Sequence, residues 1–286
     1  MRSLGIDVGV RKGLDLVLLD DSLAILDAHR AVHLPELGAL IEAAQADIVA
    51  IDAPPRWAFR PGGSRLTEQE IRRFGIQVFG TPSEDRHHEQ AFYEWMTVGF
   101  EVFKVAGSKG FGRYGPPGAA LLTAIEVFPH ASAVVLAGCL PPRSVGKREW
   151  RRGILQARGV SAGGLRSADQ VDAALAALTG LYALRGNSFA PGDPKEGVIV
   201  LPALTLPPPP YRRCPEPERT DDGQLILWGF APCRCGDAAC TALTKGEFAP
   251  GHDAKRKSAL WKRAREGHDA LDELRRRGWE PPPEMR

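Results

Sequence analysis

Four aspartates stand where their carboxylates could do metal chemistry. Asp7 interrupts the apolar run "GIDVG", Asp52 ends "DIVAID", and Asp169 and Asp172 lie three residues apart in "DQVDA". Carboxylates that are brought close together repel one another, and a divalent cation relieves that repulsion. Two Mg²⁺ ions about 3.5–4 Å apart, bridged by carboxylates, serve in-line phosphoryl displacement. We therefore expect Asp7, Asp52 and Asp172 to hold Mg²⁺ or Mn²⁺, with Asp169 as a further catalytic candidate.

Each carboxylate also has an alternative role without a metal. Asp7 lies among glycines and could make a turn, and Asp52 precedes Ala-Pro-Pro and could cap one. Asp169 falls in the first turn of a predicted helix, where the helix dipole stabilises a carboxylate by about 0.3–1 kcal/mol. Asp172 adjoins the apolar stripe of that helix, so the dipole explains it less well.

The order of the predicted elements could bring these carboxylates together. Three short apolar runs predict an antiparallel meander, and a helix and a buried strand follow: 3–9, 14–20, 23–28, 34–45 and 46–52. The clearest helix spans 167–184, where Ser167 and Gln170 form a capping box. If the first strand lies beside the fourth, Asp7 and Asp52 face each other near one edge of a mixed sheet.

The rest of the chain predicts an insertion, two further strands and a separate module. The segment 62–118 is rich in charged and aromatic residues and predicts a helical insertion over one edge of the sheet. A strand at 121–129 contains Glu126, and an extended segment follows at 196–202. A Pro-rich stretch then breaks regular structure, because proline fixes φ and lacks an N–H donor. The predicted organisation is a first domain, a linker and a C-terminal module: 1–206, 207–222 and 223–286.

This pattern resembles known nucleases. The order strand, strand, strand, helix, strand, with an aspartate in the first and fourth strands and a "DQVDA" helix, is similar to the ribonuclease H-like fold, especially its Holliday-junction-resolvase branch. The fuller set of motifs resembles domain of unknown function 429, a bacterial family of predicted ribonuclease H-like nucleases: "GIDVG", "AIDAP", "EVFPH", "DQVDAALAAL" and "GDPKEGVIVLP". The resemblance covers about residues 1–206. It implies an α/β fold with a mixed five-stranded sheet flanked by helices. It also implies that the four aspartates are metal ligands, with Glu126 as a further acidic position.

Basic and aromatic residues near these motifs could contact nucleic acid. The candidates follow Asp52 or lie in "GKREWRRGILQARG": Arg56, Arg60, Arg65, Lys147 and Arg151. These side chains would neutralise backbone phosphates, and Trp150 would stack a base. The second segment could equally be the solvated face of an amphipathic helix. Glu126 could likewise pair with an arginine or lysine of the insertion.

Four of the five cysteines crowd the last quarter of the chain. The sequence "CRCGDAAC" has the spacing C-x-C-x4-C, and Zn²⁺ requires four tetrahedral ligands. We predict a structural zinc site formed by three thiolates and one further ligand: Cys233, Cys235 and Cys240, with His252 or Cys214 as the fourth. A basic helix at about 253–277 could contact phosphates, and the alternative is a free-thiol loop beside a salt-bridged helix. Cys139 stands apart and is interpreted as a small buried apolar side chain.

Composition limits the remaining function classes. Charges nearly balance, with 37 lysines and arginines against 35 aspartates and glutamates, so a nucleic-acid-binding role must come from local patches. No apolar run approaches membrane-spanning length and no export signal is visible, so we expect a cytoplasmic protein without a membrane partner. Because resolvase-like enzymes often act as dimers, a homodimer is a further expectation.

Three functions compete on these observations. The leading interpretation is a divalent-metal-dependent nuclease that hydrolyses phosphodiester bonds of DNA or RNA. The second is a protein with a degenerate site that binds nucleic acid or another protein through its zinc module and insertion. The third is an actin-like-fold ATPase, because "GIDVG" also resembles the first phosphate loop of that class. That class needs a second Asp-Gly phosphate motif, which the chain does not clearly show.

Overall fold

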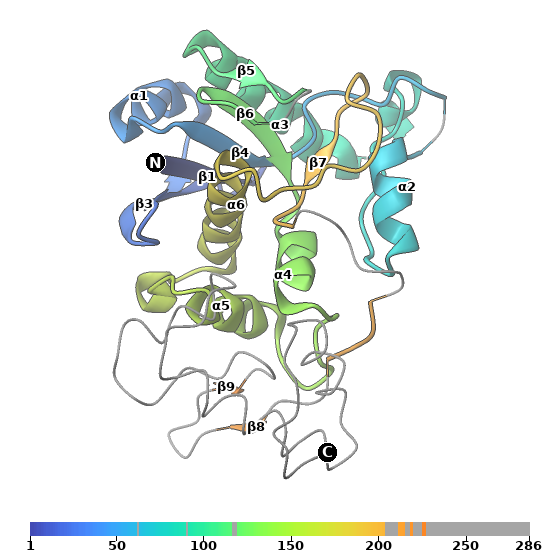
Figure 1. Cartoon of the computed structure of the whole chain (residues 1–286). Coiled ribbons are helices and arrows are strands. Elements are labelled where there is room, and N and C mark those ends of the chain that lie inside the picture. The colour runs from blue at the N-terminus through green and yellow to red at the C-terminus, as the bar shows by residue number, and fades with distance from the viewer. Residues whose placement is uncertain are drawn as a thin grey trace. The chain divides into compact units, whose positions relative to one another are not determined.

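The computed structural model describes residues 1–61, 63–89, 91–115, 119–203, 211–214, 218–219 and 225–226. The chain divides into two compact units, one made of 1–156 with 160–228 and the other of 157–159 with 229–286. Nearly all of the second unit lies outside the described residues. The sheet and the helices that cover it belong to the first unit (Figure 1).

The first three strands form an antiparallel meander: β1 (Arg2–Val8), β2 (Leu14–Asp20) and β3 (Ile25–Val32). The strands predicted at 3–9 and 14–20 are confirmed. The third strand begins later than the predicted 23–28 and runs further. The reason is local, because Asp20 Oδ1 accepts the backbone N–H of Ala24 at 3.0 Å and holds this segment in the turn.

The second half of the sheet is parallel. β4 (Ile48–Asp52) pairs with β1, and β6 (Thr123–Val127) pairs with β4. Two short strands, β5 (Gly112–Arg113) and β7 (Ile199–Val200), both pair with β6. Among the described residues this makes a seven-stranded mixed sheet in the order β3-β2-β1-β4-β6-β5, with β7 also beside β6. The mixed α/β class is confirmed, and the two short strands raise the number above the expected five.

Helices cover both faces of the sheet (Figure 1). α6 (Ala168–Leu184) packs on β1, β2 and β4, and α4 (Pro129–Ala137) packs against α6. α1 (Leu34–Ala44) and α3 (Glu94–Ser108) pack together on the other face. Leu4 and Ile6 of β1 belong to the core with α1 and α3. Because side chains alternate along a strand, Gly5 and Asp7 point toward α6.

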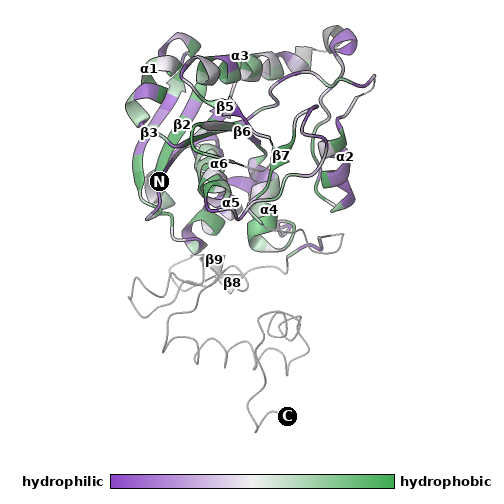
Figure 2. Ribbon diagram, turned by 45° about the horizontal axis from the view of Figure 1, so that its top comes forward, coloured by the Kyte–Doolittle hydropathy of each residue, from purple (hydrophilic) through white to green (hydrophobic). Residues whose placement is uncertain are grey.

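The segment predicted as a helical insertion is helical but is not confined to an edge. It contains α2, two 3-10 helices and α3: α2 (Leu66–Arg73), η1 (Glu84–Glu89) and η2 (Ala91–Tyr93) precede α3. α3 carries hydrophobic and hydrophilic residues along its length (Figure 2). Its buried residues recur every three or four positions, from Met96 to Ala106, and pack on the sheet. α3 is therefore a core layer of the first domain.

Part of the expected linker is tied to the first unit. Tyr211 is buried, and its N–H donates to the carbonyl oxygen of Phe74 at 2.8 Å. β8 (Glu218–Arg219) and β9 (Leu225–Ile226) then pair as a two-stranded antiparallel sheet. The remaining helices are α5 (Lys147–Ala157) and η3 (Ala162–Gly164). None of the described helices has the length and apolar character needed to cross a bilayer.

Candidate active site

Asp7 and Asp52 lie side by side at the carboxyl ends of two parallel strands. The β1–β4 register pairs Asp7 directly with Asp52. Partners in register point to the same face of a sheet, and Asp7 faces α6, so both carboxyl groups lie on that side. The Asp52 carboxyl donates a hydrogen bond to the Asp7 carboxylate. The structure thus brings together the first two aspartates that the sequence singled out.

The glycine two residues before Asp7 allows the third element to approach. A Cβ on Gly5 would overlap the carbonyl oxygen of Ala173 in α6, so the helix rests directly on the backbone of β1 there. Asp172 precedes Ala173 and is therefore held next to Asp7. The start of α6 is fixed by the predicted capping box, in which Ser167 Oγ accepts the backbone N–H of Gln170 at 2.9 Å.

Asp172 is held by one partner and has one oxygen without a partner. Its Oδ2 accepts a hydrogen bond from Nη1 of Arg151 in an ion pair whose side chains are 16% and 13% exposed. Its Oδ1 is buried and has no hydrogen-bond partner among the described residues. A buried carboxylate oxygen without a partner costs free energy, so this atom is open to a further ligand. Arg151, expected on phosphate, instead pairs with this carboxylate.

Burial and nearby charges favour the protonated form of the clustered aspartates over the ionised form. Burial, and then repulsion from Asp172, Asp169 and Asp15, raises the pKa of Asp7 to about 8. Burial, followed by Asp7 and Asp172, raises the pKa of Asp52 well above its ordinary value, and Arg151 offsets part of that rise. Burial also raises the pKa of Asp172, against the Arg151 ion pair. A divalent cation is the ligand that could replace these protons.

Asp169 and Asp15 lie at the rim of the cluster. Asp169 pairs with Lys12 at 3.4 Å, and both side chains are substantially exposed. Asp15 stands opposite Asp7 in the β1–β2 register and is buried. It accepts a hydrogen bond from Ser167 Oγ at 2.7 Å, which ties β2 to the start of α6. Our sequence reasoning missed Asp15, although a carboxylate inside the apolar run "LDLVLLD" is the same signal that identified Asp7.

The carboxylate oxygens of the cluster are suitable ligands for a hard divalent cation, but they are not arranged around one common point. Carboxylate oxygens are the ligands that Mg²⁺ and Mn²⁺ prefer. Across the described part of the chain, no three histidine, cysteine or acidic side chains are placed to hold one ion as they stand. Asp52 is engaged with Asp7, and Asp172 is engaged with Arg151. Asp172 can therefore offer a cation its Oδ1, while its Oδ2 stays paired with Arg151.

Glu126 does not join this cluster. It pairs in register with Ile51, whose side chain belongs to the core on the α3 face, so Glu126 points away from α6. Arg65 Nη1 and Nη2 donate to the two oxygens of Glu126 at 2.7 and 2.5 Å. Burial raises the pKa of Glu126 to about 7, and Arg65 offsets part of the rise. The alternative, that Glu126 pairs with a basic residue of the insertion, is confirmed, and a role among the carboxylates facing α6 is wrong.

Arg65 is therefore a core residue and not a phosphate contact. Its side chain is only 1% exposed, and its Nε also donates to Glu68 Oε1 at 2.9 Å. Thr81 completes the network, because its Oγ1 donates to Glu68 at 2.5 Å. The expectation that Arg65 binds nucleic acid is corrected, since a guanidinium this deeply buried cannot reach a backbone phosphate.

The other basic side chains that were predicted to contact nucleic acid are more exposed to solvent than Arg65, whereas Trp150 is buried. Arg60 and Lys147 are exposed, and the guanidinium of Arg56 lies 4.6 Å from the ring centroid of Phe59. These side chains can reach solvent and remain predictions as phosphate contacts. Trp150 is 1% exposed and packs in the core, so the expectation that it stacks a base is wrong.

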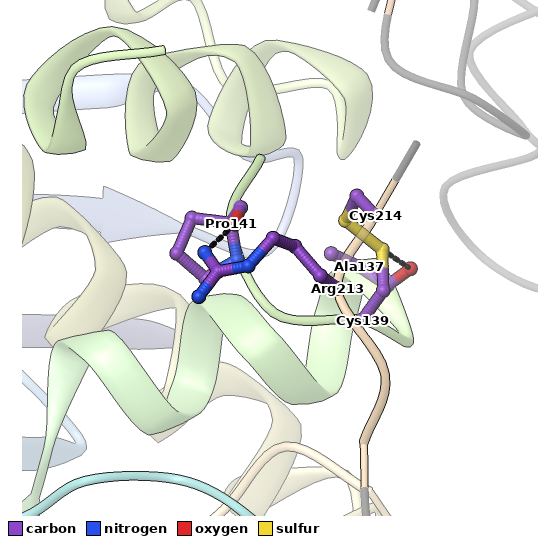
Figure 3. The surroundings of a disulfide bond; sticks show 5 residues. All are labelled: Ala137, Cys139, Pro141, Arg213 and Cys214. Carbon is purple, nitrogen blue, oxygen red and sulfur yellow. Dashed lines mark hydrogen bonds between the residues drawn. A yellow bond between two sulfur atoms is a disulfide. The ribbon is translucent and has the colours of Figure 1, made fainter. Parts of the chain in front are cut away.

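The cysteines bring a second correction. Cys139, two residues after the end of α4, forms a disulfide with Cys214, 75 residues away (Figure 3). Next to it, Arg213 Nη1 donates to the carbonyl oxygen of Pro141 at 2.7 Å (Figure 3). A cysteine in a disulfide has no thiolate for a metal, so Cys214 is not a zinc ligand in this structure and Cys139 is not a free apolar side chain. The other expected zinc ligands, and the basic helix at 253–277, lie outside the described residues: Cys233, Cys235, Cys240 and His252.

Comparison with known proteins places the chain by family. No curated protein and no solved structure matches it. The family described as "Protein of unknown function (DUF429)" matches residues 5–196. That range includes the four aspartates singled out in the sequence and covers more than half of the chain, and the protein therefore belongs to this family.

Proposed function

We propose that the protein is a divalent-metal-dependent nuclease that hydrolyses phosphodiester bonds of nucleic acid. The observation that carries the proposal is the convergence of Asp7, Asp52 and Asp172 from three elements onto one end of the sheet. Carboxylates are rarely buried without partners, and here burial and mutual repulsion raise their pKa values together. Such a cluster at a strand end is typical of a catalytic metal site.

The topology supports the same proposal. An antiparallel meander of three strands followed by parallel strands β4 and β6 is the arrangement expected for a ribonuclease H-like fold. In that fold the first strand, the fourth strand and a late helix supply the metal ligands, which are the elements that bear Asp7, Asp52 and Asp172. Fold likeness alone does not determine function, so the weight of the proposal rests on the side chains.

Asp7, Asp52 and Asp172 would hold Mg²⁺ or Mn²⁺. A bound ion of this kind supplies a lowered pKa for its coordinated water and stabilises charge on the leaving oxygen. The chain's own contribution is to hold the carboxylates in place: Gly5 fixes the height of α6 over β1, and Arg151 holds one oxygen of Asp172. Arg151 is a positioning residue, because it holds Oδ2 of Asp172 and leaves Oδ1 for the ion.

Cleavage of a substrate panel tests the proposal. Single-stranded DNA, single-stranded RNA, duplex, hybrid and four-way-junction substrates are incubated with the full chain in Mg²⁺ or Mn²⁺, and with EDTA as the blank. The wild type is compared with Asp7→Asn and with Asp85→Asn, a matched substitution at an exposed aspartate outside the cluster. We expect metal-dependent cleavage by wild type and Asp85→Asn, reduced at least about 100-fold by Asp7→Asn. Absence of cleavage on every substrate, or equal cleavage by Asp7→Asn, contradicts the proposal and favours the binding-protein interpretation.

A further inference from the structure

A cavity of about 230 Å³ lies at the carboxyl ends of β4 and β6, on the α3 side of the strand ends. Asp52 and the two residues that follow it form part of the wall, so the cavity adjoins the carboxylate cluster. In sheets with parallel strands, ligands bind outside the carboxyl ends of those strands. The cavity is therefore in the position where part of a substrate would be bound next to the reacting bond.

The polar groups in the wall are already satisfied by one another. Arg65 donates to both Glu126 and Glu68, and Glu68 also accepts from Thr81. This network has no positive charge left for a ligand, because two carboxylates share the single guanidinium of Arg65. A phosphate group inside the cavity would thus lack a counterion, so an uncharged group is the better occupant.

The rest of the wall is apolar and aromatic. The aromatic rings that line the cavity come from the insertion and from the end of β6: Phe79, Phe92, Trp95 and Phe128. Phe79 and Phe92 are 64% and 47% exposed, and their ring centroids lie 5.0 Å apart. Large aromatic side chains left open to water beside a cavity indicate a binding surface. Aromatic side chains that stack on bases are the general device by which proteins bind unpaired nucleotides.

We propose that this cavity binds one unpaired nucleobase of the substrate, so that the site acts on single-stranded or locally unpaired nucleic acid. This inference rests on the proposed nuclease function and names its substrate class. The size agrees, since about 230 Å³ is smaller than the roughly 300–1,000 Å³ of pockets for drug-sized ligands and suits one ring system. The position agrees as well, because Asp52 belongs to both the wall and the carboxylate cluster. A base held in the cavity would leave its phosphate at the strand ends where the carboxylates lie.

A binding measurement without metal separates this inference from catalysis. The affinity of the full chain is measured in EDTA by fluorescence anisotropy for three labelled oligonucleotides: a single strand, a strand of the same length with an abasic site at every position, and a blunt duplex. The abasic strand keeps the phosphates and lacks the bases. We expect the single strand to bind about 5- to 150-fold more tightly than the abasic strand, the range given by stacking of one base.

Substitutions at the rim of the cavity test whether the preference for the single strand over the abasic strand arises there. Phe79→Ala and Phe92→Ala each remove one exposed ring and should abolish most of the preference for bases. Leu121→Ala is the matched control, because Leu121 is equally exposed at 64% but precedes β6, at the opposite end of that strand from the cavity. Equal affinity for the abasic strand, or an unchanged preference in both phenylalanine variants, overturns the inference. Cleavage without any preference for bases would leave the nuclease proposal standing, and a preference without cleavage would leave only the binding site standing.

Discussion

Replacing Asp7 with asparagine should stabilise the metal-free protein at neutral pH, although it removes a residue of the candidate site. Burial and neighbouring carboxylates raise the pKa of Asp7 from 3.8 to about 8. Between those two values the folded protein holds a proton that the unfolded chain has released. Stability is therefore fully present below about pH 4, falls as the pH rises, and stops falling above about pH 8. The asparagine side chain of the variant has no proton to lose, so the contribution of residue 7 to this dependence disappears, while Asp52 and Asp172 still titrate.

The magnitude follows from the proton difference. One proton bound in the folded state alone lowers the free energy of unfolding by about 1.4 kcal/mol per pH unit, or roughly 3 kcal/mol between pH 5 and pH 7. The advantage of Asp7→Asn over wild type should therefore grow by roughly 3 kcal/mol across that interval. Urea denaturation at pH 5, 6 and 7 in EDTA measures it, with Asp85→Asn as the control at an exposed aspartate. Parallel pH profiles for wild type and Asp7→Asn would refute the claim that Asp7 is buried among like charges.

Three further substitutions test how the cluster and its supports are built. Gly5→Ala should lower the free energy of unfolding by about 3 kcal/mol or more, because the new Cβ overlaps the carbonyl oxygen of Ala173. A thermal melt unchanged from wild type would show that α6 does not rest on β1. Arg151→Gln should lower the free energy of unfolding by about 1–3 kcal/mol in EDTA, because it leaves Asp172 buried without its counterion. Mn²⁺ should recover part of that loss. A melting temperature equal to that of wild type in EDTA would show that the ion pair does not stabilise the fold. Cys139→Ser should lower the free energy of unfolding by about 4 kcal/mol without reductant, the amount expected when a disulfide closes a separation of 75 residues. A reducing agent should remove the difference from wild type. A difference that persists under reduction would come from the packing of the side chain and not from the disulfide.

Much of the fold was predictable because its signals are local. Apolar alternation and continuous apolar runs identified β1, β2 and β4, and the capping box identified the start of α6. The convergence of Asp7 and Asp52 was predicted on the condition that the first strand lies beside the fourth, which the β1–β4 pairing fulfils. Such signals lie within a few residues of one another, so one sequence is enough to reveal them.

The errors concern features that depend on register and burial. Glu126 stands in a strand as expected, and the side of the sheet to which it points depends on a register with β4 that the sequence does not contain. Arg65 and Trp150 resemble their exposed neighbours in sequence and differ only in tertiary burial. The disulfide between Cys139 and Cys214 joins residues far apart in the chain, and cysteine spacing alone does not reveal pairing.

The affinity of the aspartate cluster for Mn²⁺ decides whether Asp7, Asp52 and Asp172 form a metal site. Mn²⁺ is titrated calorimetrically into the full-length wild type, Asp7→Asn and Asp85→Asn at pH 8, close to the pKa of Asp7, where a cation displaces its proton more easily than at neutral pH. Any ion bound elsewhere in the chain is common to all three proteins and cancels in the comparison. We expect a saturable site in wild type and Asp85→Asn that is lost or at least about tenfold weaker in Asp7→Asn. Equal Mn²⁺ affinity in wild type and Asp7→Asn would show that Asp7 binds no metal.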